Sequence, residues 1–200
     1  MTTKKLFLSI CFIIFCFRGF SQNPQIIDTL KIHQQIKSFG LNEGLLDFNN
    51  NFFKSIIFKN DSTLLYNPNG TLHLFEIILS DTPVVSKLTN GEFHGHNFGR
   101  LLFIHDNIIY SFGGVGLFNR FSKLIYFDSS LKEWYEKQIK NYPFDSRKVV
   151  NSWNYGDKLM VLLNHYSKFD DETPNRYTNY SFGEIDLKSF EYTNHFKFER

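Results

Sequence analysis

Cysteine is scarce in this 200-residue chain, and it occurs in one place only. Both cysteines, Cys11 and Cys16, lie within an apolar run of twelve residues, 6–17. If this run is removed as part of a leader, the remaining chain carries no thiol, which excludes disulfides, thiolate metal sites and cysteine nucleophiles. A lipoprotein anchor is not expected, because bulky Ile10 and Phe15 precede the two cysteines.

Long apolar runs are also missing, apart from this short one at the N-terminus. Lys4 and Lys5 precede the run, and small or polar residues follow it up to Gln22. The run is too short to span a bilayer, and this layout is typical of a secretory signal peptide. We therefore expect residues 1–22 to be a signal peptide and the protein to be periplasmic, cell-surface or secreted, with no membrane span after cleavage. The alternative is an uncleaved N-terminal anchor.

The chain without its leader has no excess of positive or negative charge. The sequence has 22 basic and 20 acidic residues, and three of the basic ones, Lys4, Lys5 and Arg18, lie in the leader. Their removal leaves 19 basic residues against 20 acidic ones, a formal charge of about −1. No basic surface for nucleic acid is therefore expected.

Aromatic residues are abundant, with 24 Phe and 10 Tyr. This composition favours β structure. After Asn49, clusters of Asn, Asp and Gly regularly separate short apolar runs, as in an all-β protein. Residues 23–49 are only partly consistent with helical spacing, and we interpret them as a lead-in segment.

The apolar runs repeat along the chain. Residues 127–134 match residues 185–192 position by position, each reading apolar, Asp, five variable residues, aromatic. Each repeated unit can be divided into four short strands, which is typical of the blades of a β-propeller. The expected units are residues 52–90, 96–142 and 148–198.

The middle unit resembles a kelch repeat. It has Ile-Ile-Tyr-Ser-Phe followed by Gly113-Gly114, and then Phe127-Asp128 with Trp134 further on. In kelch repeats the glycine pair ends one strand and the tryptophan fills space between blades. The third unit has Asp186 and Tyr192 in the positions of Asp128 and Trp134, and the first unit matches more weakly.

The resemblance implies an all-β fold, with residues 50–200 forming about three four-stranded antiparallel blades of a kelch-type propeller, similar to exported galactose-oxidase-like propeller proteins of bacteria. Propellers usually close with four to eight blades, so three would leave an incomplete ring with open edges. The chain is then interpreted as a truncated gene product, as the N-terminal part of a longer propeller, or as a module that completes its ring by associating with itself through these edges. A β-sandwich is the alternative fold.

Candidate metal ligands are few. His94 and His96 are two residues apart and would face the same side of a strand, and His105 is near in sequence. Asp170, Asp171 and Glu172 form an acidic cluster, but the alternation and glycine that calcium loops use are missing. We expect the histidines to form hydrogen bonds in turns or between blades, and the acidic residues to lie in a solvated loop. No metal and no cofactor are expected.

No catalytic constellation is recognisable. The sequence has no Gly-x-Ser-x-Gly elbow and no phosphate-binding loop. Copper oxidases among the kelch-like propellers use a tyrosine crosslinked to a cysteine, and the mature chain has no cysteine. We therefore expect no enzymatic activity.

The expected function is non-catalytic recognition or scaffolding, in which propeller loops bind a protein or a carbohydrate. The candidate ligand loop lies between Leu163 and Glu184. The alternative is a periplasmic or secreted glycan-acting enzyme, which clustered acids would favour, whereas an exposed aromatic patch would favour binding. The candidate ligand-binding residues are Tyr166, Asp170, Asp171, Arg176 and Tyr177.

Overall fold

The computed structural model describes residues 29–41, 55–91, 98–114, 122–143, 147–166 and 178–199. The predicted signal peptide lies outside these residues. Within them, no helix is both long enough and apolar enough to cross a bilayer.

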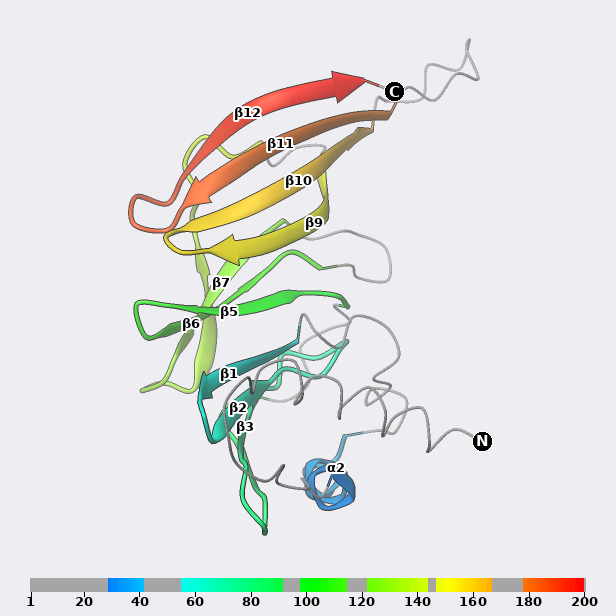
Figure 1. Cartoon of the computed structure of the whole chain (residues 1–200), viewed down its shortest axis with the longest axis vertical. Helices are drawn as coiled ribbons and strands as arrows, with labels where there is room; N and C mark the ends of the chain where they lie inside the picture. Colours follow the sequence, from blue (N-terminus) through cyan, green and yellow to red (C-terminus); the bar gives the residue numbers. More distant parts are fainter. Residues whose placement is uncertain are drawn as a thin grey trace, which may run out of the picture.

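Twelve strands form three four-stranded antiparallel sheets, each with its strands in chain order. The predicted all-β class with three four-stranded units is therefore confirmed, and the described residues form no closed ring (Figure 1). The first sheet contains β1 (Ile56–Asn60), β2 (Thr63–Tyr66), β3 (Phe75–Ile78) and β4 (Val84–Lys87). The second contains β5 (Leu101–His105), β6 (Ile108–Phe112), β7 (Leu124–Asp128) and β8 (Glu133–Lys137). The third contains β9 (Arg147–Tyr155), β10 (Lys158–Tyr166), β11 (Thr178–Asp186) and β12 (Glu191–Glu199).

The three sheets follow one another along the longest axis of the molecule (Figure 1). The first strand of each sheet lies next to the first strand of its neighbour, so β1 contacts β5 and β5 contacts β9. The sheets therefore share one orientation, as adjacent blades do.

Part of the lead-in segment is helical. Helix α2 (Thr29–Ser38) covers the outer face of the first sheet, where Ile32 and Ile36 join a core cluster with Phe75 and Val85. The side chain of Gln35 accepts a hydrogen bond from the Val85 amide at 2.9 Å and donates one to the Pro83 carbonyl at 2.8 Å. The helix thus protects both the outer face and the edge strand β4 at this end of the molecule.

Two further clusters join the sheets. Leu65 and Leu74 of the first sheet region are fully buried against Leu102 and Phe127 of the second. The cluster between the second and third sheets combines aromatic residues on one side with aliphatic residues on the other. Its members include Phe103, Tyr110, Phe112 and Leu124 from the second sheet, and Leu159, Val161, Leu163 and Ile185 from the third.

The matched sequence segments form matched turns. Asp128 accepts hydrogen bonds from the amides of Ser130 and Leu131, and Asp186 accepts them from the amides of Lys188 and Ser189. These bonds, together with those from the hydroxyls of Ser130 and Ser189, hold the pKa of both carboxyls below the usual value. An aspartate at the equivalent position therefore shapes the outer hairpin in each of two successive sheets.

The residues of the kelch-like motif occupy distinctive positions. Gly113 and Gly114 follow β6 with φ of 74° and 102°, a region that glycine adopts without strain. Trp134 packs against the first sheet and donates its indole N–H to the Leu72 carbonyl at 2.8 Å. Tyr192, its counterpart in the third sheet, packs edge-on against Tyr142 at 5.3 Å between ring centroids.

Replacement of Trp134 tests this inter-sheet packing. Trp134→Ala removes the indole from the junction of two sheets and leaves the Leu72 carbonyl without this donor, so we expect it to cost about 3 kcal/mol of unfolding free energy. Urea denaturation followed by circular dichroism measures the difference.

The neighbouring Tyr135 is the matched control, because it is exposed and follows Trp134 on the same strand. Tyr135→Ala should cost less than about 1 kcal/mol. A cost below about 0.5 kcal/mol for Trp134→Ala would contradict the assigned role of the indole.

Candidate functional site

The predicted ligand loop falls largely outside the described residues. Tyr166 is the last residue of β10, where it pairs with Thr178 of β11. Asp170, Asp171, Arg176 and Tyr177 lie outside the described residues, so their role stays a prediction. The same holds for His94, His96 and Glu172.

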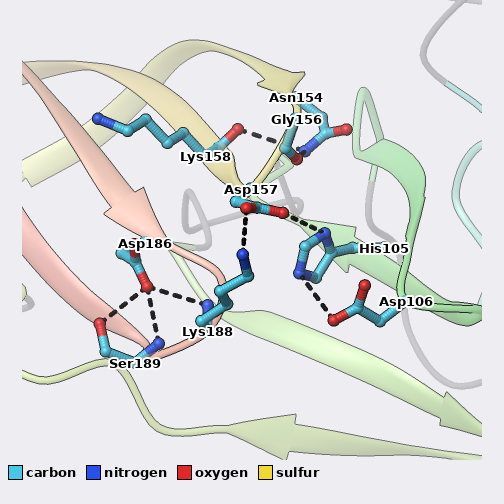
Figure 2. A network of polar contacts seen from close by, with 9 residues as sticks. All are labelled: His105, Asp106, Asn154, Gly156, Asp157, Lys158, Asp186, Lys188 and Ser189. Atoms are coloured by element: carbon cyan, nitrogen blue, oxygen red, sulfur yellow. Dashed lines mark hydrogen bonds and ion pairs between the residues drawn. The ribbon is translucent and has the colours of Figure 1, made fainter.

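Three hairpin turns meet at one junction between the second and third sheets (Figure 2). Asp157, in the turn between β9 and β10, forms an ion pair with Lys188 of the β11–β12 turn. The Asp157 carbonyl also accepts a hydrogen bond from the Leu187 amide at 2.8 Å. On the other side, Oδ1 of Asp157 lies 3.9 Å from Nδ1 of His105, at the end of β5. Asp157 therefore connects both sheets.

His105 takes part in this junction from a buried position. Its residue is only 8% exposed, and Nε2 lies 3.5 Å from a carboxylate oxygen of Asp106. The described residues contain no group of three or more His, Cys, Asp and Glu side chains arranged to hold a metal ion. His105 lies between the carboxylates of Asp106 and Asp157, and its buried Nε2 makes no hydrogen bond among the described residues.

The β11–β12 turn is thus fixed from two directions. Asp186 holds it from within, and Lys188 anchors it to Asp157 (Figure 2). The Lys188–Asp157 pair is largely exposed, so its contribution to stability is small and its effect is to position the turn. Ser189 and Phe190 are held in place as a result.

The far side of this turn borders a cleft of about 480 Å³ between the second and third sheets. Strands β7 and β8, with the residues that follow β8, form the opposite wall. The lining residues are Tyr126, Glu136, Lys137, Gln138, Lys140, Ser189 and Phe190.

The cleft carries positive charge. The carboxylate of Glu136 is paired with Lys123 at 2.6 Å, whereas no carboxylate of the described residues pairs with Lys137 or Lys140. The ammonium group of Lys137 lies 4.2 Å from the centroid of the Phe190 ring, a cation–π contact. The backbone of Lys140 is fixed by hydrogen bonds with Phe190 and Tyr192. These lysines leave the cleft suited to an anionic group.

Phe190 occupies an unusual backbone conformation for a bulky residue. Its φ is 55°, in the left-handed region, and its ring lies near Tyr110 and under Lys137. The matching position in the second sheet, with φ of 58°, is Lys132. The left-handed conformation is therefore a property of the repeated turn. The lining of the cleft adds Tyr126, Lys137, Lys140 and Phe190 to the candidate residues, and the sequence alone indicates none of them.

A second distinctive surface is the outer face of the third sheet. Trp153 is 43% exposed and Phe196 is 53% exposed. Both rings stack against Phe182, at 5.8 and 5.1 Å between centroids. These rings form an aromatic patch that is partly exposed on this face of the sheet.

An ionic group lies beside these rings. Glu184 is paired with Lys158 at 2.6 Å and with His195 at 3.0 Å. The hydrogen bond from Lys158, followed by that from His195, lowers the pKa of Glu184 below its usual value. The negative charge of the Glu184 carboxylate is therefore balanced by Lys158 of the same sheet.

The chain matches no protein-family model, and a search of curated proteins finds no relative.

The lowered pKa of Glu184 predicts a pH-dependent contribution to stability. Because the folded pKa lies below the unfolded value of about 4.3, the contribution is present above that pH and is lost as the pH falls through the folded pKa. Glu184→Gln should therefore reduce the unfolding free energy at pH 7 by at most about 1 kcal/mol, and by less at pH 2.5. Urea denaturation at both pH values measures the difference, and an equal cost at the two would contradict it.

Proposed function

We propose that this chain is a non-catalytic, exported recognition module of the kelch type, and that the cleft between its second and third sheets binds an acidic carbohydrate. The observation that carries the proposal is the combination, among the residues that line one cleft, of two lysines, Lys137 and Lys140, with two aromatic residues, Tyr126 and Phe190. These groups come from adjacent sheets, so the site depends on their packing.

Three features support the kelch assignment. Gly113 and Gly114 end β6 in conformations that suit glycine. Trp134 fills space between the first and second sheets. The Asp128 and Asp186 turns repeat the same hydrogen bonds in successive sheets. Each feature corresponds to a position in the kelch-like motif of the sequence.

The size and chemistry of the cleft suit a carbohydrate bearing carboxylates, such as a uronate oligomer. Ligand sites commonly measure about 300–1,000 Å³, and a volume of about 480 Å³ lies within that range. Aromatic side chains combine apolar contact area with defined geometry, so Tyr126 offers a surface for a sugar ring, whereas the Phe190 ring positions the Lys137 ammonium group. Lys137 and Lys140 would pair with the carboxylates, and the Gln138 amide can bond hydroxyl groups.

The lining supports binding rather than hydrolysis. Glycoside hydrolysis usually needs two carboxyl groups on either side of the scissile bond. The cleft contains one, Glu136, and that carboxylate is engaged by Lys123. A hydrolytic role for this cleft therefore has no support from its carboxylates.

Binding of trigalacturonate tests the proposed site. The double variant Lys137→Gln, Lys140→Gln removes both charges, and we expect its affinity to fall at least tenfold in isothermal titration calorimetry, equivalent to about 1.4 kcal/mol. Lys132→Gln is the matched control, because Lys132 is exposed in the β7–β8 turn and lies outside the cleft. Equal affinity in the double variant and the control would contradict the site.

Three further conditions define the ligand class. Neutral trigalactose and a poly-glutamate peptide should bind at least tenfold more weakly than trigalacturonate. The affinity should fall as salt is raised from 50 to 500 mM, because exposed charges are screened. Cleavage of trigalacturonate during a long incubation would contradict the non-catalytic assignment.

Export makes a separate prediction. When the chain is expressed in a bacterium with its own N-terminus, we expect the protein in the periplasm or medium to begin within about three residues of Asn23. Intact-mass and N-terminal peptide analysis measure this. A chain that retains Met1 and stays with the membrane would contradict cleavage and favour an uncleaved anchor.

A further inference from the structure

A buried guanidinium without a partner lies at the start of the second sheet. Arg100 immediately precedes β5, and its Nε and Nη1 atoms are buried and make no hydrogen bond among the described residues. Burial lowers the pKa of Arg100 to about 10, so the group keeps its positive charge at neutral pH. A buried charge without a partner is costly, and buried donors are rarely left without an acceptor. The position therefore calls for an acceptor that carries negative charge.

A second donor without a partner lies on the same face of this sheet. Ser111 of β6 is 1% exposed, and its hydroxyl also makes no hydrogen bond in the part of the chain that the structure describes. Ser111 pairs with Leu102, which belongs to a core cluster with Leu65 of the first sheet. Because side chains alternate along a strand, Arg100 lies on the same face as Leu102, two residues away. Diagonal neighbours on a sheet face are about 7–8 Å apart, within reach of a long side chain, so both donors can reach one group.

The backbone brings no side chain to the position opposite the guanidinium. Continued by one residue, the register of β5 and β6 sets Arg100 opposite Gly113, which has φ of 74° and no Cβ. The amide of the preceding residue, Gly99, donates a hydrogen bond to the side chain of Asn69 at 3.1 Å. Asn69 follows β2, so this bond holds a turn of the first sheet beside the start of β5. The two donors therefore lie at one end of the junction between the first two sheets, and Arg100 is partly exposed there.

Packing between sheets does not account for the Ser111 hydroxyl. In the third sheet the position of Ser111, fifty residues later, is taken by Val161, which is fully buried in the apolar cluster against the second sheet. Val161 pairs with the first strand of its sheet as Ser111 does. An apolar side chain thus fits this position between sheets, and the hydroxyl needs another reason.

The chemistry of the two donors selects the class of ligand. A guanidinium has five N–H donors and no acceptor, and its planar shape matches the oxygens of carboxylate, sulfate and phosphate groups. A serine hydroxyl adds one O–H donor. A water molecule could accept a hydrogen bond from Ser111, but it would leave the charge of Arg100 unbalanced. An oxyanion satisfies both requirements.

We propose that Arg100 and Ser111 form a binding site for an oxyanion, a carboxylate, sulfate or phosphate group, at the junction of the first two sheets. The oxyanion accepts hydrogen bonds from the guanidinium and from the hydroxyl. Neither residue lines the cleft between the second and third sheets. The proposal therefore stands apart from the proposed carbohydrate function.

Urea denaturation of the purified exported chain at constant ionic strength tests the site. Sodium chloride is replaced stepwise by sodium acetate, sulfate or phosphate, and an ion that binds only the folded state raises the unfolding midpoint. We expect at least one of these oxyanions to raise the midpoint, with a response that saturates. A response to acetate assigns the site to carboxylates, and a response to sulfate or phosphate alone assigns it to tetrahedral oxyanions.

Arg100→Met removes the charge and keeps an unbranched side chain. In chloride alone it should unfold at the same or a higher urea concentration than the wild type, because it removes an unpaired buried charge. Its dissociation constant for the active oxyanion should be at least about tenfold higher, and that of Ser111→Ala at least about threefold higher. Any residual rise in Arg100→Met measures the general effect of the salt. Lys132→Met is the matched control, because it removes one positive charge from an exposed turn and should respond as the wild type does.

Nuclear magnetic resonance gives a direct readout of the guanidinium. In a proton–nitrogen correlation spectrum, the Nε–H signal of Arg100 is the one that disappears in Arg100→Met. It should shift when the active oxyanion is added and should stay in place when chloride is added. A guanidinium with only a packing role would show no such difference.

Two results would overturn the proposal. The first is a midpoint that no oxyanion raises; if Arg100→Met also destabilises the chain in chloride, the guanidinium has a partner within the chain. The second is a response that Arg100→Met retains and that the double variant Lys137→Gln, Lys140→Gln loses, which would place the oxyanion in the carbohydrate cleft. The double variant should instead keep the response, so failure of this site and failure of the carbohydrate cleft are distinguished.

Discussion

Face-to-face packing of the sheets is the interaction on which the rest of the structure depends. An isolated four-stranded sheet leaves apolar side chains on both faces, and here each sheet covers its neighbour. Aromatic residues such as Tyr110 and Phe112 on one side meet aliphatic residues such as Val161 and Leu163 on the other. Helix α2 provides the same cover at one end. The stack therefore accounts for the core, for the protected N-terminal end and for the aromatic surface left at the C-terminal end.

The candidate site is a product of this packing. Lys137 is the last residue of the outer strand β8 of the second sheet and Lys140 follows that strand, whereas Phe190 belongs to a turn of the third sheet. Asp186 shapes that turn locally, and the contact of Lys188 with Asp157 holds it near the junction with His105 (Figure 2). A recognition site at such a junction uses the rigidity of two sheets without requiring a long loop.

The sequence carries the local part of this structure. Turn residues and β-forming runs predict the strands, and the match between residues 127–134 and 185–192 predicts equivalent hairpins because Asp128 and Asp186 act within their own turns. The cleft was not predictable in this way, because Tyr126 and Phe190 are brought together only by packing between units. Phe190 did offer one signal, as an aromatic residue at a turn position where the other repeat has Lys132. The sequence analysis predicts an incomplete ring with open edges. In the structure, the exposed aromatic surface at the C-terminal end is the outer face of the third sheet.

Hydrogen–deuterium exchange measured by mass spectrometry tests the central claim most directly, because it reports whether the three sheets open together. If packing between faces stabilises every sheet, the inner strands β2, β6 and β10 should exchange at similar slow rates through a shared opening. Destabilising the junction of the first two sheets should then increase exchange in both of them. Three independent rates, with one sheet unaffected when its neighbour opens, would contradict the account.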